Sequence, residues 1–107
     1  MALDRGYVDE VMKRLTPLGA ITGKGMFGGY GIWEDGDMFA LVDSGSTLHF
    51  KVDDATRDRY AGAGGSQFMT MPYWSVPAEV LEDEDRFSDW ARHAIAVGHA
   101  TAKRTRR

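Results

Sequence analysis

Residues 23–33 read Gly-Lys-Gly-Met-Phe-Gly-Gly-Tyr-Gly-Ile-Trp, and this stretch decides the fold because it combines five glycines with three aromatic residues. Glycine at this density indicates backbone positions with positive φ, or places where the chain passes close to another backbone or a ligand. Aromatic rings are costly to leave in water. We therefore expect Phe27, Tyr30 and Trp33 to enter a core or to meet a partner.

The glycines also match a nucleotide-binding pattern, G-x-G-x-x-G, at Gly23, Gly25 and Gly28. A dinucleotide site needs these glycines between a strand and the N-terminus of a helix, whose free N–H groups hold the pyrophosphate. The next elements instead predict a hairpin, because Asp35-Gly36 is a two-residue turn signal between apolar runs. We interpret the glycines as bends in a strand pair, and keep a small-ligand or enzymatic site at this stretch as an alternative.

Counting outward from that turn predicts the register of the hairpin. The expected facing pairs are Trp33 with Met38, Ile32 with Phe39, Tyr30 with Leu41 and, as a small like-charge penalty at the tip, Glu34 with Asp37. Residues 47–52 then alternate apolar and polar, with His49 on the polar side. Residues 20–52 are thus predicted to form an antiparallel meander with at least one buried face.

One helix is predicted on either side of the meander. Residues 4–15 place apolar side chains at helical spacing, and Glu10 and Arg14 form an i,i+4 ion pair on the other face. Asp53 is a natural N-cap for a short helix over residues 54–61, which ends at the glycines beyond it.

The rest of the chain is predicted to return to the sheet and then to end in the longest helix. Residues 66–71 fit a further strand, whereas residues 71–77 contain two prolines and are expected to be irregular. From Glu84 to at least Ala102, apolar residues recur at helical spacing behind an acidic start. Gly98 in this helix would allow close packing against the sheet or against a second copy.

These elements predict the α+β class: an antiparallel meander sheet of about five strands with an N-terminal helix, a short middle helix and a long C-terminal helix packed on it. Residues 1–107 are expected to form a single domain, since this length suits one core. Residues 103–107 form a basic tail that we expect to fray. Because a small antiparallel sheet has edges to protect, homodimerisation through a sheet edge or the last helix is an additional hypothesis.

Composition narrows the class of protein. With 43% hydrophobic and 11% aromatic residues, the chain is expected to fold rather than remain disordered. It has no cysteine, no apolar run near the roughly 20 residues of a membrane span and no secretory segment at its charged N-terminus. We therefore expect a cytoplasmic protein without membrane contact. The net charge is −3, but four of the 13 Lys and Arg lie in the last five positions, so the acidic body should repel nucleic acid.

The sequence contains no convincing catalytic or metal-binding constellation. His93 and His99 point away from each other on one helix, and His49 lies on a strand, so the three histidines do not predict a metal site. Asp89 and His93 fit a surface pair better than a general base with its orienting carboxylate. The acidic run at residues 82–85 lacks calcium-loop spacing, and no serine lies in a nucleophile elbow. We predict no catalytic residue, no metal and no cofactor.

A basic stripe on the last helix is the candidate contact for nucleic acid or for an acidic partner. If the helix continues to the end of the chain, the stripe comprises Arg92, His99, Lys103 and Arg106, within about 60° of one another. Such cations can meet phosphates. The alternative is a solvated helix end whose cations complement the helix dipole.

A series of short motifs runs through the chain in a fixed order: residues 26–31 (MFGGYG), an Asp-Gly turn into residues 38–41 (MFAL), Leu48 with residues 51–53 (KVD), residues 71–74 (MPYW) and residues 76–77 (VP). The series covers most of the chain and closely resembles the TfoX N-terminal domain family. This resemblance implies an α+β domain with an antiparallel sheet and helices on one side. It also implies a link to bacterial regulators of natural competence genes, which act with the transcription machinery and have no known catalytic activity.

Full-length regulators of this kind join the domain to a second, helical C-terminal domain, for which 107 residues leave no room, so we expect a stand-alone domain. The first functional hypothesis is a non-enzymatic regulatory or interaction module that presents Phe27, Tyr73 and Trp74 to a protein partner. These aromatic residues lie on backbone punctuated by glycine and proline. The second hypothesis is a nucleic-acid accessory domain that uses the basic stripe, with DNA as the ligand.

Overall fold

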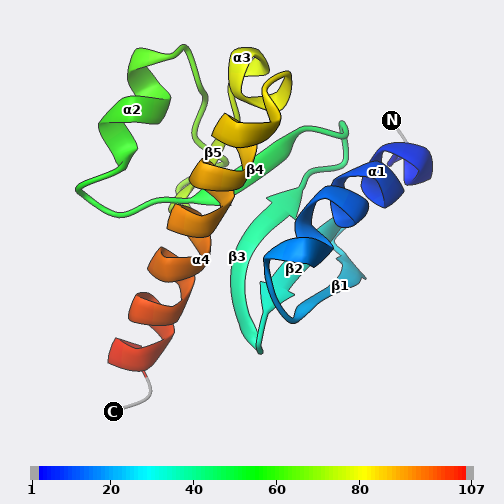
Figure 1. Cartoon of the computed structure of the whole chain (residues 1–107), viewed down its shortest axis with the longest axis horizontal. Helices are drawn as coiled ribbons and strands as arrows, with labels where there is room; N and C mark the ends of the chain where they lie inside the picture. Colours follow the sequence, from blue (N-terminus) through cyan, green and yellow to red (C-terminus); the bar gives the residue numbers. More distant parts are fainter. Residues whose placement is uncertain (1–2, 106–107) are drawn as a thin grey trace.

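The computed structural model describes residues 3–105, with side chains through residue 103. Its elements follow the chain in the order α1 (Arg5–Leu15), the 3-10 helix η1 (Thr16–Leu18), β1 (Ile21–Met26), β2 (Gly29–Glu34), β3 (Asp37–Val42), β4 (Leu48–Lys51), α2 (Arg57–Gly62), β5 (Tyr73–Ser75), α3 (Ala78–Leu81) and α4 (Glu84–Thr105) (Figure 1).

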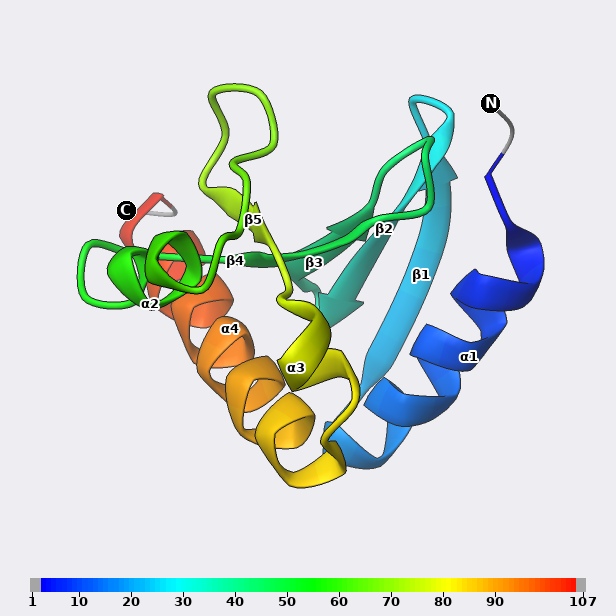
Figure 2. The ribbon, with the colours of Figure 1, turned by 90° about the horizontal axis from the view of Figure 1, so that it is seen from above.

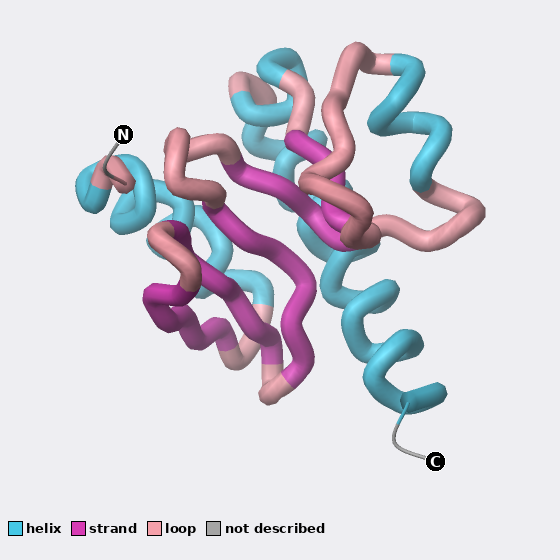
Figure 3. Tube along the Cα trace, turned by 180° about the vertical axis from the view of Figure 1, so that it is seen from behind, coloured by secondary structure: helices cyan, strands magenta, loops and turns pink. Residues whose placement is uncertain are grey.

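The five strands form one antiparallel sheet in the order β1-β2-β3-β4-β5, so each strand pairs with its neighbour in the chain. Figure 2 shows that α1, α3 and α4 lie on the same side of this sheet. From behind, in Figure 3, the strands lie in front of the helices, and the loop before β5 crosses part of the sheet. The predicted α+β meander with helices on one side is confirmed. No helix within residues 3–105 covers the opposite face of the sheet, which is here called the open face.

The hydrophobic core lies between the sheet and the helices. The rings of Phe39, Phe50 and Phe87 connect β3, β4 and α4, with successive centroids 6.3 and 5.7 Å apart. Close approach of α4 depends on Gly98, because a Cβ added there would lie 2.7 Å from the carbonyl oxygen of Met38. The predicted close packing of this helix against the sheet is therefore confirmed.

The β2–β3 hairpin contains a β-bulge that the count from the turn did not anticipate. The observed pairs are Trp33 with Met38, Ile32 with Ala40 and Tyr30 with Val42, so the predicted pairs of Ile32 with Phe39 and Tyr30 with Leu41 are wrong. The extra residue is Phe39, and both Phe39 and Ala40 pack into the core. As a result Met38 and Leu41, on either side of them, both lie on the open face.

The fifth strand forms where the sequence predicted irregular structure. β5 pairs with β4, whereas residues 66–71, predicted as a strand, form a loop with one isolated bridge from Gln67 to Trp74. Three residues of strand fit between Pro72 and Pro77, so neither proline has to donate an N–H to the ladder.

The short helix α2 begins at Arg57, later than predicted. The carboxylate of Asp53 accepts hydrogen bonds from the N–H and the hydroxyl of Thr56, at 2.9 and 3.0 Å. This local network holds the intervening residues in a turn rather than a helix.

Arg14 links the first helix to the last, and the predicted ion pair with Glu10 is wrong. Its guanidinium bonds to the carboxylate of Glu84 at 2.8 Å and to the carbonyl oxygen of Leu81 at 2.8 Å. It also lies over the ring of Phe87, 3.8 Å from the centroid. A long-range contact has thus replaced the local pair.

The glycine-rich stretch bends two strands and makes room for rings. Phe27 and Gly28 form the tight turn between β1 and β2, with φ of 51° and 77°, and a strand rather than a helix follows. Side chains fill the space that two missing Cβ atoms leave. Tyr30 of β2 lies over Gly23 of β1, and Met26 of β1 and Trp33 of the same strand β2 lie over Gly31. This confirms the interpretation of the glycines as structural.

Candidate functional site

An apolar groove lies on the open face of the sheet. It has a volume of about 350 Å³ and is lined by Met26, Phe27, Gly29, Tyr30, Met38, Leu41, Val42, Asp43, Ser44, Phe68, Met69 and Met71. Three separate parts of the chain contribute: the β1–β2 turn, strand β3 with the loop after it, and the loop before β5. Its size falls within the range of ligand sites, and its lining is mostly apolar.

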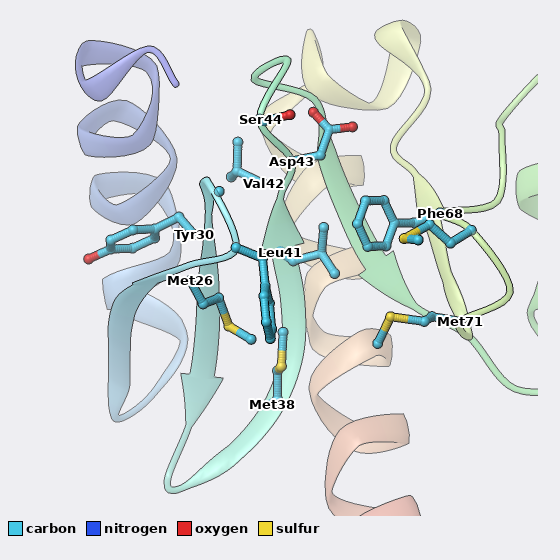
Figure 4. Close-up of a pocket in the computed structure, with 12 residues that line it drawn as sticks. Met26, Tyr30, Met38, Leu41, Val42, Asp43, Ser44, Phe68 and Met71 are labelled. Carbon is cyan, nitrogen blue, oxygen red and sulfur yellow. The ribbon is translucent and has the colours of Figure 1, made fainter. Parts of the chain in front are cut away.

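Methionine dominates the walls of this groove. Four of the six methionines of the chain line it, namely Met26, Met38, Met69 and Met71. Figure 4 shows Met26 and Met38 on one side and Met71 and Phe68 on the other, with Leu41 between them. Methionine is unbranched and polarizable, so a surface rich in it adapts to ligands of different shape.

The rim consists of side chains that stand in solvent. Phe27 is 96% exposed and Met69 is 76% exposed, which is unusual for large apolar residues. Both also have left-handed backbone, with φ of 51° and 54°. A bulky residue in this conformation costs of order 1–3 kcal/mol, and such strain concentrates at functional sites. Two strained, exposed apolar residues on opposite rims of one groove favour a contact role.

A buried histidine, His49 of β4, pairs with Leu41 of β3, which lines the groove. His49 is only 4% exposed, so the predicted polar side of β4 is in fact covered, by the ring of Phe68 at 5.2 Å between centroids. The Nδ1 of His49 lies 3.0 Å from the carbonyl oxygen of Thr47, so Nδ1 carries the proton that is donated. Burial lowers the pKa of His49, although the nearby Asp43 carboxylate opposes this effect.

Charges surround the groove unevenly. Asp43 is the charged residue among those that line it, and its Oδ1 accepts hydrogen bonds from the N–H groups of Gly45 and Thr47, at 2.9 and 3.0 Å. Lys24 lies on β1, two residues before Met26 and on the same face. Lys51 lies on the same face of β4, with its Nζ 5.8 Å from the centroid of the Tyr73 ring.

The structure separates the three aromatic residues that were predicted to contact a partner. Phe27 is exposed at the groove, whereas Tyr73 is 4% exposed beside Lys51, and burial raises the pKa of its hydroxyl to about 12. Trp74 is half-buried and packs against the core on the helical side. Of the three, Phe27 is the one presented to solvent.

The family model of the TfoX N-terminal domain matches residues 13–98, from α1 to α4. The chain belongs to the TfoX N-terminal domain family. This family is associated with the regulation of competence. A comparison with curated proteins gave no significant match. The part of this TfoX N-terminal domain that matches includes every residue that lines the groove.

The basic stripe predicted on the last helix of this TfoX N-terminal domain is only partly assembled. The imidazole of His99 lies between two carboxylates of the β2–β3 hairpin, with Nε2 2.5 Å from Glu34 and Nδ1 2.7 Å from Asp37. These hydrogen bonds raise the pKa of His99, the bond to Asp37 contributing most. Arg92 and Lys103 are exposed on α4, and Arg106 lies outside the described residues.

The third histidine of the TfoX N-terminal domain, His93, lies on the surface. His93 and Asp89 are 3.8 Å apart on the exposed side of α4, as predicted for a surface pair. Within residues 3–103, no three His, Asp or Glu side chains are arranged to hold a metal ion. No helix in the described part of the chain is long and apolar enough to cross a membrane.

Sequence reasoning missed the groove because its lining comes from segments that are not adjacent in sequence. One signal was available: Met69 and Met71 come directly before Pro72, in a segment rich in polar and small residues that was predicted as a strand. Exposed apolar residues in a loop are unusual, and they would have indicated a contact surface.

Proposed function

We propose that this TfoX N-terminal domain is a non-enzymatic regulatory module that acts through protein contact, with the open face of its sheet as the contact surface. Membership of the family supports a role in the regulation of competence genes. The observation that carries the proposal is the groove with Phe27, 96% exposed, on its rim. Large exposed apolar patches on soluble domains mark interaction sites.

The character of the groove favours binding over catalysis. Its lining is apolar apart from Asp43 and Ser44 at one end, and the carboxylate of Asp43 is engaged with the turn that follows it. A general acid or base needs a reactive partner within hydrogen-bond reach of a substrate. His49 lies beneath Phe68 rather than in the groove.

Photo-crosslinking in the parent bacterium tests the contact surface. A photoreactive phenylalanine analogue at position 27 should form adducts with one or a few proteins, whereas the same analogue at exposed Asp58 on α2 should not. In a strain lacking the gene, a Phe27→Ser copy should fail to restore competence-gene transcription, and an Asp58→Ser copy should restore it. Equal adducts at both positions, together with full restoration by Phe27→Ser, would contradict the proposal.

A further inference from the structure

We propose that the groove binds a protein segment that carries bulky apolar side chains between two acidic residues. This inference rests on the proposed interaction function and names the chemistry of the partner. It depends on three features of the open face: the apolar lining, the exposed rims and the two lysines that flank them.

The lining selects apolar side chains. Met26 and Met38 face Met71 and Phe68 across Leu41, and all five are brought together from different strands and loops. Flexible thioethers can close around aliphatic or aromatic groups, which places bulky apolar residues at the centre of the bound segment.

The rims select a protein rather than a small molecule. Phe27 and Met69 are 96% and 76% exposed, so they project from the groove instead of closing it. A small molecule inside the groove would leave both side chains in water. A protein segment, together with the surface from which it comes, can cover them, and burial of such side chains is what stabilises interfaces.

The lysines select carboxylates at the two ends. Lys24 is on β1 and Lys51 is on β4, so the two cations are separated by three strand spacings, roughly 14 Å across the sheet. Between them, Asp43 is the carboxylate that lines the groove, and its Oδ1 already accepts two N–H groups. A segment with acidic residues on both sides of its apolar centre matches this charge pattern.

The same charges disfavour a second copy of the chain as the occupant. Two open faces placed against each other would bring the Lys24 and Lys51 side chains of both copies into one interface, and like charges at an interface weaken it. Six of the 16 acidic residues of the chain lie together on α3, α4 and the turn between them, on the helical side: Glu79, Glu82, Asp83, Glu84, Asp85 and Asp89.

Synthetic peptides provide the test. Three peptides share one apolar centre containing leucine and phenylalanine, and their flanking positions carry Glu in the first, Gln in the second and Lys in the third. Binding to the full chain is measured by fluorescence anisotropy at low and at high salt. The Glu peptide should bind about threefold to tenfold more tightly than the Gln peptide, and the Lys peptide should bind most weakly. The difference should shrink at high salt.

Methionine methyl resonances locate the binding. Those of Met26, Met38, Met69 and Met71 should shift, whereas that of Met12, which packs on the helical side, should not. The double variant Lys24→Gln/Lys51→Gln keeps the aliphatic stems and should reduce the advantage of the Glu peptide to within about twofold. The matched control Lys13→Gln/Arg92→Gln makes the same change in net charge on the helical side and should preserve the advantage. Thermal melts of both variants verify that they fold.

Three results would overturn the inference. The first is equal affinity for all three peptides. The second is a shift of the same methyl groups on dilution of the free chain, which would identify a second copy as the occupant. The third is saturation of the groove by decanoate with displacement of the Glu peptide, which would identify a small apolar ligand. If crosslinking from position 27 succeeds while the peptides bind without charge preference, the proposed function stands and this inference alone fails.

Discussion

At the scale of single residues, His99 connects the last helix to the tip of the β2–β3 hairpin. Glu34 and Asp37 face each other there, and the imidazole lies 2.5 and 2.7 Å from them. A neutral imidazole has one N–H and cannot donate to both carboxylates, so this geometry requires the doubly protonated ring. The expected like-charge penalty has become an ion-pair triad that ties α4 to the sheet.

The triad predicts a pH-dependent stability. The pKa of His99 is raised by its bonds to Asp37 and Glu34, so its contribution is complete below the ordinary value of 6.5 and is lost as pH rises through the higher folded-state pKa. The pKa of Glu34 is lowered, mainly by the N–H of Ala20 and then by His99, so its contribution is complete above 4.5 and is lost as pH falls through the lower folded-state value. The His99→Gln variant should therefore lose most stability between about pH 4.5 and 6.5.

Urea unfolding of both proteins, from about pH 4 to about pH 9, measures the difference. The matched control is His93→Gln on the same helix, where the contact with Asp89 is on the surface and should contribute little. A difference between wild type and His99→Gln that grows steadily above pH 8 would contradict the assignment.

At the scale of elements, the hairpin of β1 and β2 shows why glycine recurs in its sequence. Gly29 is buried against the neighbouring strand, and an added Cβ would collide with the backbone carbonyl oxygen of Val42. A Cβ added at Gly25, on the partner strand, would come no closer than 3.9 Å to any other atom, the carbonyl oxygen of Gly29. Glycines of the same motif thus have different structural requirements.

Alanine substitutions at Gly29 and Gly25 should change the free energy of unfolding by different amounts. Gly29→Ala should lower the free energy of unfolding by about 1–3 kcal/mol, because a backbone atom has to move. Gly25→Ala should be neutral or stabilising by up to about 1 kcal/mol, since it reduces the freedom of the unfolded chain. Urea denaturation of the two variants measures both changes. Equal losses of unfolding free energy at the two positions would show that the contact with Val42 is not what makes Gly29 necessary.

At the scale of the whole molecule, Arg14 joins the two ends of the fold. Its side chain is 24% exposed, whereas that of its ion-pair partner Glu84 is 74% exposed. The carbonyl oxygen of Leu81 and the ring of Phe87 complete its surroundings. Most of its contribution should therefore come from the carbonyl bond and the ring contact rather than from the ion pair.

Single substitutions should show that Arg14 contributes more to stability than its ion-pair partner Glu84. Arg14→Ala should cost about 2–3 kcal/mol of unfolding free energy, and Glu84→Ala about 0–1 kcal/mol. The double variant in a mutant cycle should give a coupling of about 0.2–1 kcal/mol. A coupling near the full cost of Arg14→Ala would instead assign the stability to the ion pair.

Local sequence patterns predicted much of the architecture. The features that they missed depend on contacts between residues that are far apart in the sequence. The Asp35-Gly36 turn and the long last helix follow from turn chemistry and periodicity, and both are confirmed. The bulge at Phe39 depends on how α4 packs over β3, which no local pattern records. The same holds for His99, whose carboxylate partners are 62 and 65 residues away. The groove joins three segments, so of its residues only Phe27 was predicted as a contact.

The turn at Phe27 and the loop around Met69 connect strands of a sheet whose hydrophobic core lies on its opposite face, against the helices. Replacement of their tips does not require the core to repack. Recognition and foldability are therefore largely decoupled in this architecture: one scaffold can acquire new binding preferences through a few surface substitutions, while the information that directs folding stays untouched.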